Sequence, residues 1–142
     1  DHFVTWNGHR FDVPVIAFRT LIDHLVINNK LLDDKHHTDL KAVLSNGNIS
    51  LISGLDRVSK HLELPGKALH SGTVVWDLYV DNKIQEIIQY CEADVLNTYL
   101  IYLHHQYTIA EISNDQLREK KETLKSFLSS SEHHHNEFIE KL

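Results

Sequence analysis

The pattern of apolar and polar positions predicts a largely helical chain that opens with one strand. Residues 2–6 alternate and are rich in β-branched and aromatic types, which is typical of a strand, and the turn-forming pair Asn7-Gly8 follows at once. From residue 83 to about 107, apolar residues recur at three- and four-residue steps without a Gly or Pro. This spacing predicts one long helix packed into the core. Its apolar set comprises Ile84, Ile87, Ile88, Cys91, Val95, Leu96, Tyr99, Leu100 and Leu103.

Shorter helical patterns lie on both sides of the long one. Asp12 is expected to cap a helix that has Pro14 in its first turn and apolar residues as far as Val26. The sequence Leu64-Pro65-Gly66-Lys67 is a stop signal, and residues 71–82 fit a strand or a helix equally. Further helices are expected at 39–44, at 51–62, from Asn114 to about 128, and in a last short piece ending near Ile139 after a break at 129–131.

Only one convincing strand emerges from this pattern. A single strand cannot bury itself, so the other strands of its sheet are expected upstream of Asp1. The chain also begins with Asp and contains no Met, which predicts that an N-terminal segment precedes these residues. We therefore expect 1–142 to form a partial domain.

Composition narrows the class of protein. A chain of 142 residues with 42% hydrophobic content fits one compact globular domain, and no apolar run approaches the roughly 20 residues that span a bilayer. The single cysteine, Cys91, is expected to be a packed thiol in a reducing, cytoplasmic setting. The net charge of −6 opposes blanket phosphate neutralisation, yet it suits carboxylates that hold divalent cations.

Two short segments carry candidate chemistry. The first runs from Asn7 to Pro14 and presents an amide and the carboxylate of Asp12 at a strand-to-helix junction. In the second, Tyr90 and Asp94 stand one turn apart on the long helix, so their side chains can serve one site. Purely structural interpretations remain open: a turn and a helix cap for the first segment, a core Tyr and a paired Asp for the second.

Together these segments resemble motifs II and III of the DEDD exonucleases in their Tyr-containing subclass, where motif II reads like Asn-Gly-x-x-Phe-Asp-x-Pro and motif III like Tyr-x-x-x-Asp. Nearly the whole chain is similar to the bacterial predicted 3′–5′ exonucleases related to the proofreading domain of family B DNA polymerases. The stretches that carry this similarity are Thr5-Trp6-Asn7-Gly8, His37-Thr38-Asp39-Leu40, Leu64-Pro65-Gly66-Lys67 and residues 90–99.

The resemblance implies an α/β, ribonuclease H-like exonuclease fold that is truncated before motif II and therefore mostly helical here. The first acidic motif, Asp-x-Glu, is expected upstream, and the fragment is expected to be inactive alone. By resemblance, two divalent ions, Mg²⁺ or Mn²⁺, would be held in part by Asp12 and Asp94, and Tyr90 would orient the attacking water. Asn7 and Phe11 would bind the terminal nucleotides by hydrogen bonding and stacking.

The implied activity is metal-dependent hydrolysis of phosphodiester bonds at single-stranded or frayed 3′ ends of DNA, as in repair or proofreading-like trimming, with no membrane involved. The alternative is an inert nucleic-acid-interaction or scaffold domain that keeps the exonuclease fold. Asp39 is interpreted as a helix N-cap in preference to a metal ligand. The pairs His36-His37 and His104-His105 and the run 133–135 are interpreted as solvated surface histidines, because neighbouring side chains on a helix diverge.

Overall fold

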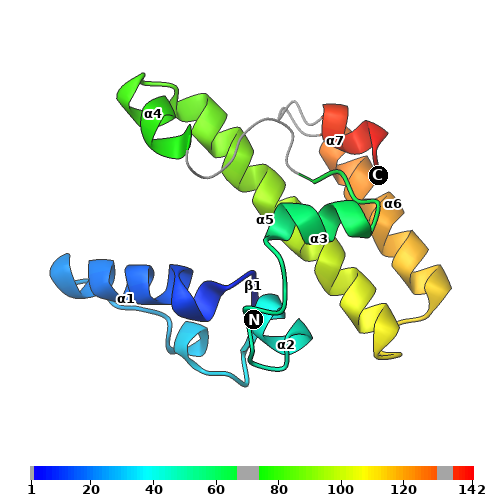
Figure 1. The fold of residues 1–142 in the computed structure, drawn as a ribbon, viewed down its shortest axis with the longest axis horizontal. Helices are drawn as coiled ribbons and strands as arrows, with labels where there is room; N and C mark the ends of the chain where they lie inside the picture. Colours follow the sequence, from blue (N-terminus) through cyan, green and yellow to red (C-terminus); the bar gives the residue numbers. More distant parts are fainter. Residues whose placement is uncertain (1, 67–73, 131–135) are drawn as a thin grey trace. The chain divides into compact units, whose positions relative to one another are not determined.

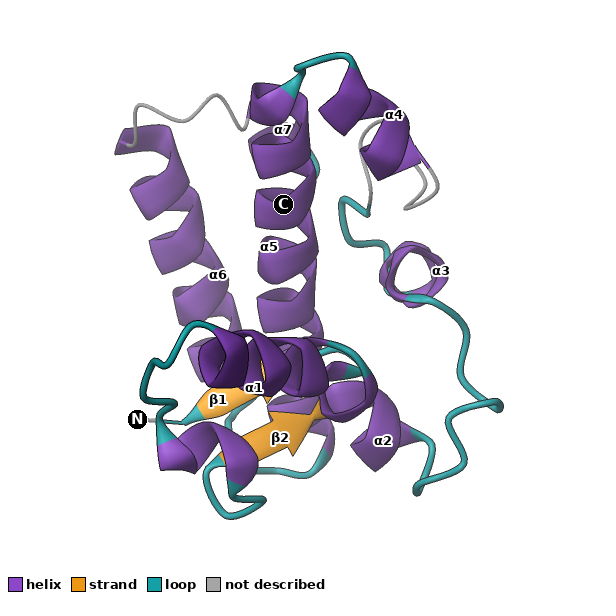
Figure 2. Ribbon diagram, turned by 90° about the vertical axis from the view of Figure 1, so that its left-hand side faces the viewer, coloured by secondary structure: helices purple, strands orange, loops and turns teal. Residues whose placement is uncertain are grey.

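The computed structural model describes residues 2–66, 74–130 and 136–142. The chain divides into two compact units, Asp1–Ser53 and Gly54–Leu142. Helices dominate both units, and the first also holds a two-stranded sheet (Figure 2). The mixed, helix-rich α/β character expected from the sequence is compatible with this architecture.

The first unit is a strand–helix–strand arrangement. Strand β1 (Phe3–Thr5) is followed by a 3₁₀ turn, η1 (Gly8–Arg10), and by helix α1 (Asp12–Ile22). A second 3₁₀ turn, η2 (Asn29–Leu32), leads into strand β2 (His37–Asp39), and helix α2 (Leu40–Leu44) follows directly. The strands pair in parallel, with Phe3 opposite His37 and Thr5 opposite Asp39. Parallel pairing needs a long crossover, and α1 with η2 supplies it.

Strand β2 corrects the expectation of a single strand whose partners all lie upstream. Its three residues, His37, Thr38 and Asp39, are polar and too few to show a period-two pattern. They are extended because the backbone of β1 hydrogen bonds to them, which is a long-range pairing that local sequence does not reveal.

Helix α1 begins and ends earlier than its apolar pattern indicates. Asp12 is its first residue, and Phe11 occupies the N-cap position without a capping side chain, so the expected Asp12 cap is wrong. The helix ends at Ile22 because His24 adopts a left-handed φ of 53°, which leaves Leu25 and Val26 outside. Only Val13 of α1 is buried.

The second unit is built around one long helix. Helix α5 (Ile84–Thr108) contacts α3 (Leu55–His61), α4 (Val75–Val80) and α6 (Asn114–Ser130), and α7 (Asn136–Glu140) contacts α6 (Figure 1). Helices α5 and α6 run antiparallel and are joined by a short turn. The buried apolar residues of this unit are Leu55, Leu64, Leu78, Leu100, Ile101, Leu103, Leu117, Leu128 and Phe138.

The long helix confirms the prediction for 83–107 in length, but only its C-terminal half is core. Leu100, Ile101 and Leu103 are nearly inaccessible, whereas Val95 is 66% exposed. Cys91 is exposed too, so the expected packed thiol is wrong. Periodicity locates the apolar stripe of a helix, but the neighbouring elements decide how far along its length that stripe is covered.

Several segment boundaries also differ from expectation. Helix α3 starts only at Leu55, since Leu51 lies in an exposed turn. Of the ambiguous segment 71–82, Val75–Val80 is helical, and 71–73 lie outside the described residues. Lys67, Ser131 and the histidines at 133–135 lie outside them as well. Across the described chain, no helix combines the length and apolar character needed to cross a membrane.

His104 departs from the expectation of a solvated histidine. It lies on α5 and is half-buried, and its Nε2 atom is buried without a hydrogen-bond partner among the described residues. Burial lowers the pKa of His104 below its ordinary 6.5, and the positive charge of Lys121 on α6 lowers it further. The fold therefore favours the neutral ring.

A pH dependence of stability follows from this lowered pKa. Below pH 6.5 the unfolded chain binds a proton at His104 before the folded chain does, so the free energy of unfolding should fall as the pH drops from 6.5 through the lower folded pKa. We expect His104→Gln to reduce this acid sensitivity and Lys121→Gln to reduce it in part. Urea unfolding at pH 5 and pH 7.5 measures the change in the free energy of unfolding. An identical pH dependence in His104→Gln and the unsubstituted chain would contradict the lowered pKa of His104 as its cause.

Candidate active site

The loop that follows β1 has a conformation that its residue types explain. Asn7 adopts a left-handed φ of 64°, which Asn tolerates better than most residues. Gly8 is buried, and a Cβ at this position would collide with Thr5 Oγ1. The Asn-Gly pair is therefore required by the path of the chain as it leaves the strand.

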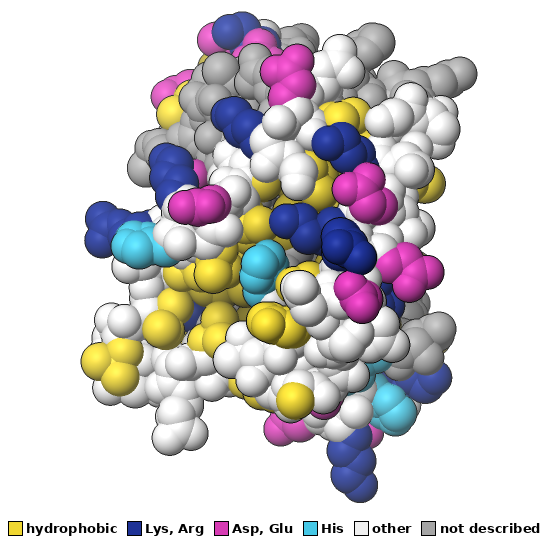
Figure 3. Space-filling view, turned by 90° about the vertical axis from the view of Figure 1, so that its right-hand side faces the viewer, with side chains coloured by type: hydrophobic (Ala, Val, Ile, Leu, Met, Phe, Trp, Pro, Cys, Tyr) yellow, Lys and Arg dark blue, Asp and Glu magenta, His cyan; other side chains and the backbone are white. Residues whose placement is uncertain are grey.

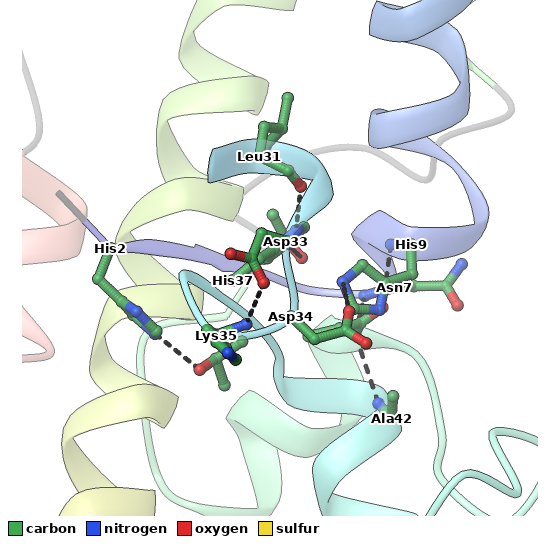
Figure 4. A network of polar contacts seen from close by, with 12 residues as sticks. His2, Asn7, His9, Leu31, Asp33, Asp34, Lys35, His37 and Ala42 are labelled. Atoms are coloured by element: carbon green, nitrogen blue, oxygen red, sulfur yellow. Dashed lines mark hydrogen bonds and ion pairs between the residues drawn. The ribbon is translucent and has the colours of Figure 1, made fainter. Parts of the chain in front are cut away.

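The carboxylate of Asp39 fixes this loop. Its Oδ1 accepts the backbone N–H of Asn7 at 2.8 Å, and its Oδ2 accepts that of His9 at 3.1 Å. Oδ1 also accepts the N–H groups of Lys41 at 3.1 Å and Ala42 at 3.4 Å, which confirms Asp39 as the N-cap of α2. Figure 4 labels Asn7, His9 and Ala42 among these donor residues. Asp39 is only 3% exposed, so these four donors serve a carboxylate that water scarcely reaches.

His37 supports the same loop from the other strand. Its Nδ1 lies 2.9 Å from the carbonyl of Leu31 and its Nε2 lies 2.8 Å from Thr5 Oγ1. A carbonyl can only accept, so Nδ1 carries the proton. The ring meets that of His9 edge-on at a centroid distance of 4.3 Å. His37 is 3% exposed, which corrects the expectation of a solvated histidine.

The residues predicted to meet a substrate lie together on this loop. The Phe11 ring is 65% exposed, and Asp12 is exposed in the first turn of α1, where the helix dipole favours a negative charge. The side-chain oxygen of Asn7 is buried and has no hydrogen-bond partner among the described residues. The loop thus presents an accessible ring and carboxylate above a fixed backbone.

The second group of predicted residues belongs to the other unit. Tyr90 and Asp94 are half-buried and stand one turn apart on α5, as their spacing predicts. The main-chain carbonyl of Asp94 accepts the Thr98 hydroxyl at 2.7 Å. The structure therefore brings Tyr90 together with Asp94 in one unit, and Asn7, Phe11 and Asp12 together in the other.

Asn97, one turn beyond Asp94 on α5, is a buried polar residue that the sequence did not single out. It is 1% exposed, and its side chain forms two hydrogen bonds with Gly66: the Gly66 N–H donates to Oδ1 at 3.0 Å, and Nδ2 donates to the Gly66 carbonyl at 2.9 Å. Nδ2 also donates to Ala93 at 2.8 Å. Gly66 has a φ of 66°, which suits glycine. The sequence signal that could have identified Asn97 is an amide side chain among the apolar positions of a helix.

A groove on α5 is separate from these residues. It lies between α5 and α6, has a volume of ≈ 550 Å³, and none of the predicted site residues lines it. Its lining residues are Tyr99, Gln116, Glu119, Lys120, Thr123, Leu124 and Phe127.

One face of the molecule shows Lys and Arg side chains beside Asp and Glu, with hydrophobic side chains between them (Figure 3). Such mixed charge agrees with the net charge of −6 in opposing broad phosphate binding by that face.

Oxygen donors of the kind that hard cations prefer are present in both groups, at Asp12 and Asp94. Within the part of the chain that the structure describes, no three His, Cys, Asp or Glu side chains gather into a metal-binding cluster. The chemistry of the donors fits Mg²⁺ or Mn²⁺, but the number gathered falls short of a complete ligand set.

Comparison with known proteins gives one match. A family model described as a predicted 3′–5′ exonuclease related to the exonuclease domain of PolB matches residues 28–142. The matched range includes Asp39, Tyr90 and Asp94, and it begins after Asp12. A search of curated proteins returned no match, and neither did a search of solved structures.

The two hydrogen bonds between Asn97 and Gly66, which we call the Asn97 clamp, predict a specific loss of stability. Asn97→Ala leaves the N–H and the carbonyl of Gly66 buried without their partner, which should lower the free energy of unfolding by about 2 kcal/mol or more. The matched control is Gln85→Ala, an exposed amide on the same helix, which should change it by less than about 0.5 kcal/mol. Urea unfolding compares them, and equal losses would contradict the clamp.

Proposed function

The chain belongs to the family of predicted 3′–5′ exonucleases related to the exonuclease domain of PolB, and we propose that it forms part of a metal-dependent nuclease that trims the 3′ ends of DNA. The observation that carries this proposal is the pair Tyr90 and Asp94, one turn apart on α5 and inside the matched range. A phenol and a carboxylate on one helix face suit the hydrolysis of a phosphodiester.

The finer assignment is the Tyr-containing subclass of DEDD exonucleases with a ribonuclease H-like fold. Asp12 is its motif II carboxylate, on a loop fixed by Asp39, and Tyr90 and Asp94 form motif III. The parallel β1–β2 pair with its helical crossover supports this proposal. The assignment requires an Asp-x-Glu motif, which residues 1–142 do not contain, so we expect the 142 residues to be inactive when expressed alone.

The side chains have distinct roles in this proposal. Asp12 and Asp94 would each offer carboxylate oxygens to divalent ions, and Mg²⁺ or Mn²⁺, when bound, would supply an activated water and relief of charge on the leaving oxygen. The Tyr90 hydroxyl orients the attacking water by hydrogen bonding, since a phenol is a good hydrogen-bond partner and a poor base at neutral pH.

The substrate is a single-stranded or frayed 3′ end, handled as in repair or proofreading. The accessible Phe11 ring is available to stack on a terminal base, a contact that any base can make. Asn7 hydrogen bonds to the same nucleotide. We do not favour the inert scaffold as an alternative, because the family match and the Tyr90–Asp94 pair both favour a nuclease.

A charge-removing substitution tests the metal-ligand role. In the intact protein, Asp94→Asn should abolish Mg²⁺-dependent release of nucleotides from a 3′-labelled oligonucleotide, because a neutral amide holds a divalent ion poorly. The matched control is Asp115→Asn on α6, whose carboxylate is exposed and pairs only with Arg118 among the described residues; it should retain activity. Full activity in Asp94→Asn would refute the assignment, and parallel DNA and RNA substrates show which sugar is preferred.

Removing one hydroxyl tests the role of Tyr90. Tyr90→Phe keeps the ring, so we expect a lower kcat with little change in KM for the oligonucleotide. Thermal unfolding supplies the control measurement. If Tyr90→Phe unfolds the protein and leaves the kcat of the remaining folded fraction unchanged, Tyr90 is a core residue and has no part in orienting water.

A further inference from the structure

Asp39 does more than cap a helix. We propose that its carboxylate positions residues 7–12, which we call the substrate loop. It sets where Asn7, Phe11 and Asp12 stand relative to the substrate. This inference rests on the proposed function, because it gives the loop a role in binding the 3′ end. It concerns only groups of the first unit, all of which the structure describes.

The distances show that capping alone does not account for Asp39. An N-cap needs one side-chain oxygen, and Ser or Asn fills that position about as well as Asp. Here Oδ1 provides the cap through Lys41 and Ala42, at 3.1 and 3.4 Å. The shortest of the four bonds, at 2.8 Å, comes instead from Asn7, 32 positions earlier in the chain. Among the described residues Oδ2 accepts only the His9 N–H, so it serves the loop and not the helix.

Burial and the register of the strands make the contact between Asp39 and Asn7 decisive for the loop. Asp39 is 3% exposed, so water does not compete effectively for its oxygens. Asn7 has a φ of 64°, which Asn tolerates well, and the 2.8 Å bond from its N–H to Asp39 holds the chain in this conformation. The register of the two strands places Thr5 opposite Asp39, which brings the carboxylate directly beneath the start of the loop.

A short series of hydrogen bonds connects the start of the loop, which Asp39 holds, to the residues proposed to act. The N–H of Arg10 donates to Asn7 at 3.2 Å, and that of Phe11 donates to Gly8 at 3.3 Å. The Phe11 carbonyl then accepts the Val15 N–H at 3.1 Å in the first turn of α1. Fixing Asn7 and His9 therefore fixes Phe11 and Asp12, although the hydrogen bonds of Asp39 go to neither of them.

Two substitutions of Asp39 separate loop positioning from capping. Asp39→Asn keeps Oδ1, and with it the bonds from Asn7, Lys41 and Ala42, but it loses the acceptor for His9. Asp39→Ser retains a cap for α2 and is too short to hold the loop. In the intact protein we expect kcat/KM on a single-stranded 3′-labelled oligonucleotide to fall about tenfold for Asn and roughly a hundredfold for Ser, as for a misplaced reacting group. The melting temperature should fall for Asn and further for Ser, because N–H groups of the loop lose their buried acceptor, so kcat/KM is compared at a temperature at which all three proteins are folded.

Amide hydrogen exchange gives a second readout that does not depend on activity. Asp39→Ser should remove protection at the N–H groups of Asn7 and His9 and preserve it at Ala42. The matched control is Asn28→Ser, which replaces the cap of η2 through Lys30 and should leave both exchange and kcat/KM unchanged.

The outcomes separate this inference from the proposed function. An active wild-type protein whose Asp39→Ser variant keeps its kcat/KM overturns the positioning role. Unchanged protection at Asn7 and His9 also overturns it. If the wild-type protein has no nuclease activity, the proposed function fails, and loss of protection would still support Asp39 as the anchor of the loop. Should Asp39→Ser not fold, Asp39→Asn gives the same test on the His9 contact alone.

Discussion

The first unit depends on a buried carboxylate that gathers backbone N–H groups from two distant segments. Strands of three residues contribute few hydrogen bonds of their own, and an isolated pair of this length is marginal in water. The Asp39 carboxylate adds four hydrogen bonds to that pairing by accepting two N–H groups of the loop after β1 and two of the first turn of α2. The carboxylate thereby joins the end of one strand to the beginning of the next helix, and the orientation of the predicted substrate loop follows from that junction.

A comparable arrangement occurs in the second unit, where an amide replaces the carboxylate. Asn97 satisfies both backbone groups of Gly66 from within the long helix, one turn beyond Asp94. Buried polar side chains of this kind are costly when unpaired, so they select the one arrangement in which every bond is made. In each unit, then, a buried polar residue holds a glycine-containing segment in place, and in the second unit Leu100 and its apolar neighbours supply the core.

The sequence predicted elements well where the pattern is long and local. Helix α5 was found from its apolar spacing because 25 residues provide many repeats of a 3.6-residue period. Strand β2 was missed, because three polar residues carry no period and their extended conformation depends on pairing with β1. The exposure of Cys91 and the burial of His37 were both wrongly predicted for one reason: the side chain that covers a residue usually belongs to another part of the chain.

By itself, the sequence determined the family, the helical character, and the residues that bear candidate chemistry, since these depend on residue types and on spacings within single elements. The turn between Tyr90 and Asp94 and the left-handed conformation of Asn7 are local in that sense. Only the tertiary structure decided that Asp39 anchors the loop of Asn7 and that Asn97 anchors Gly66. Both are hydrogen bonds between groups more than thirty residues apart, and such contacts exist only once the chain has folded to bring donor and acceptor within 3 Å or so of each other.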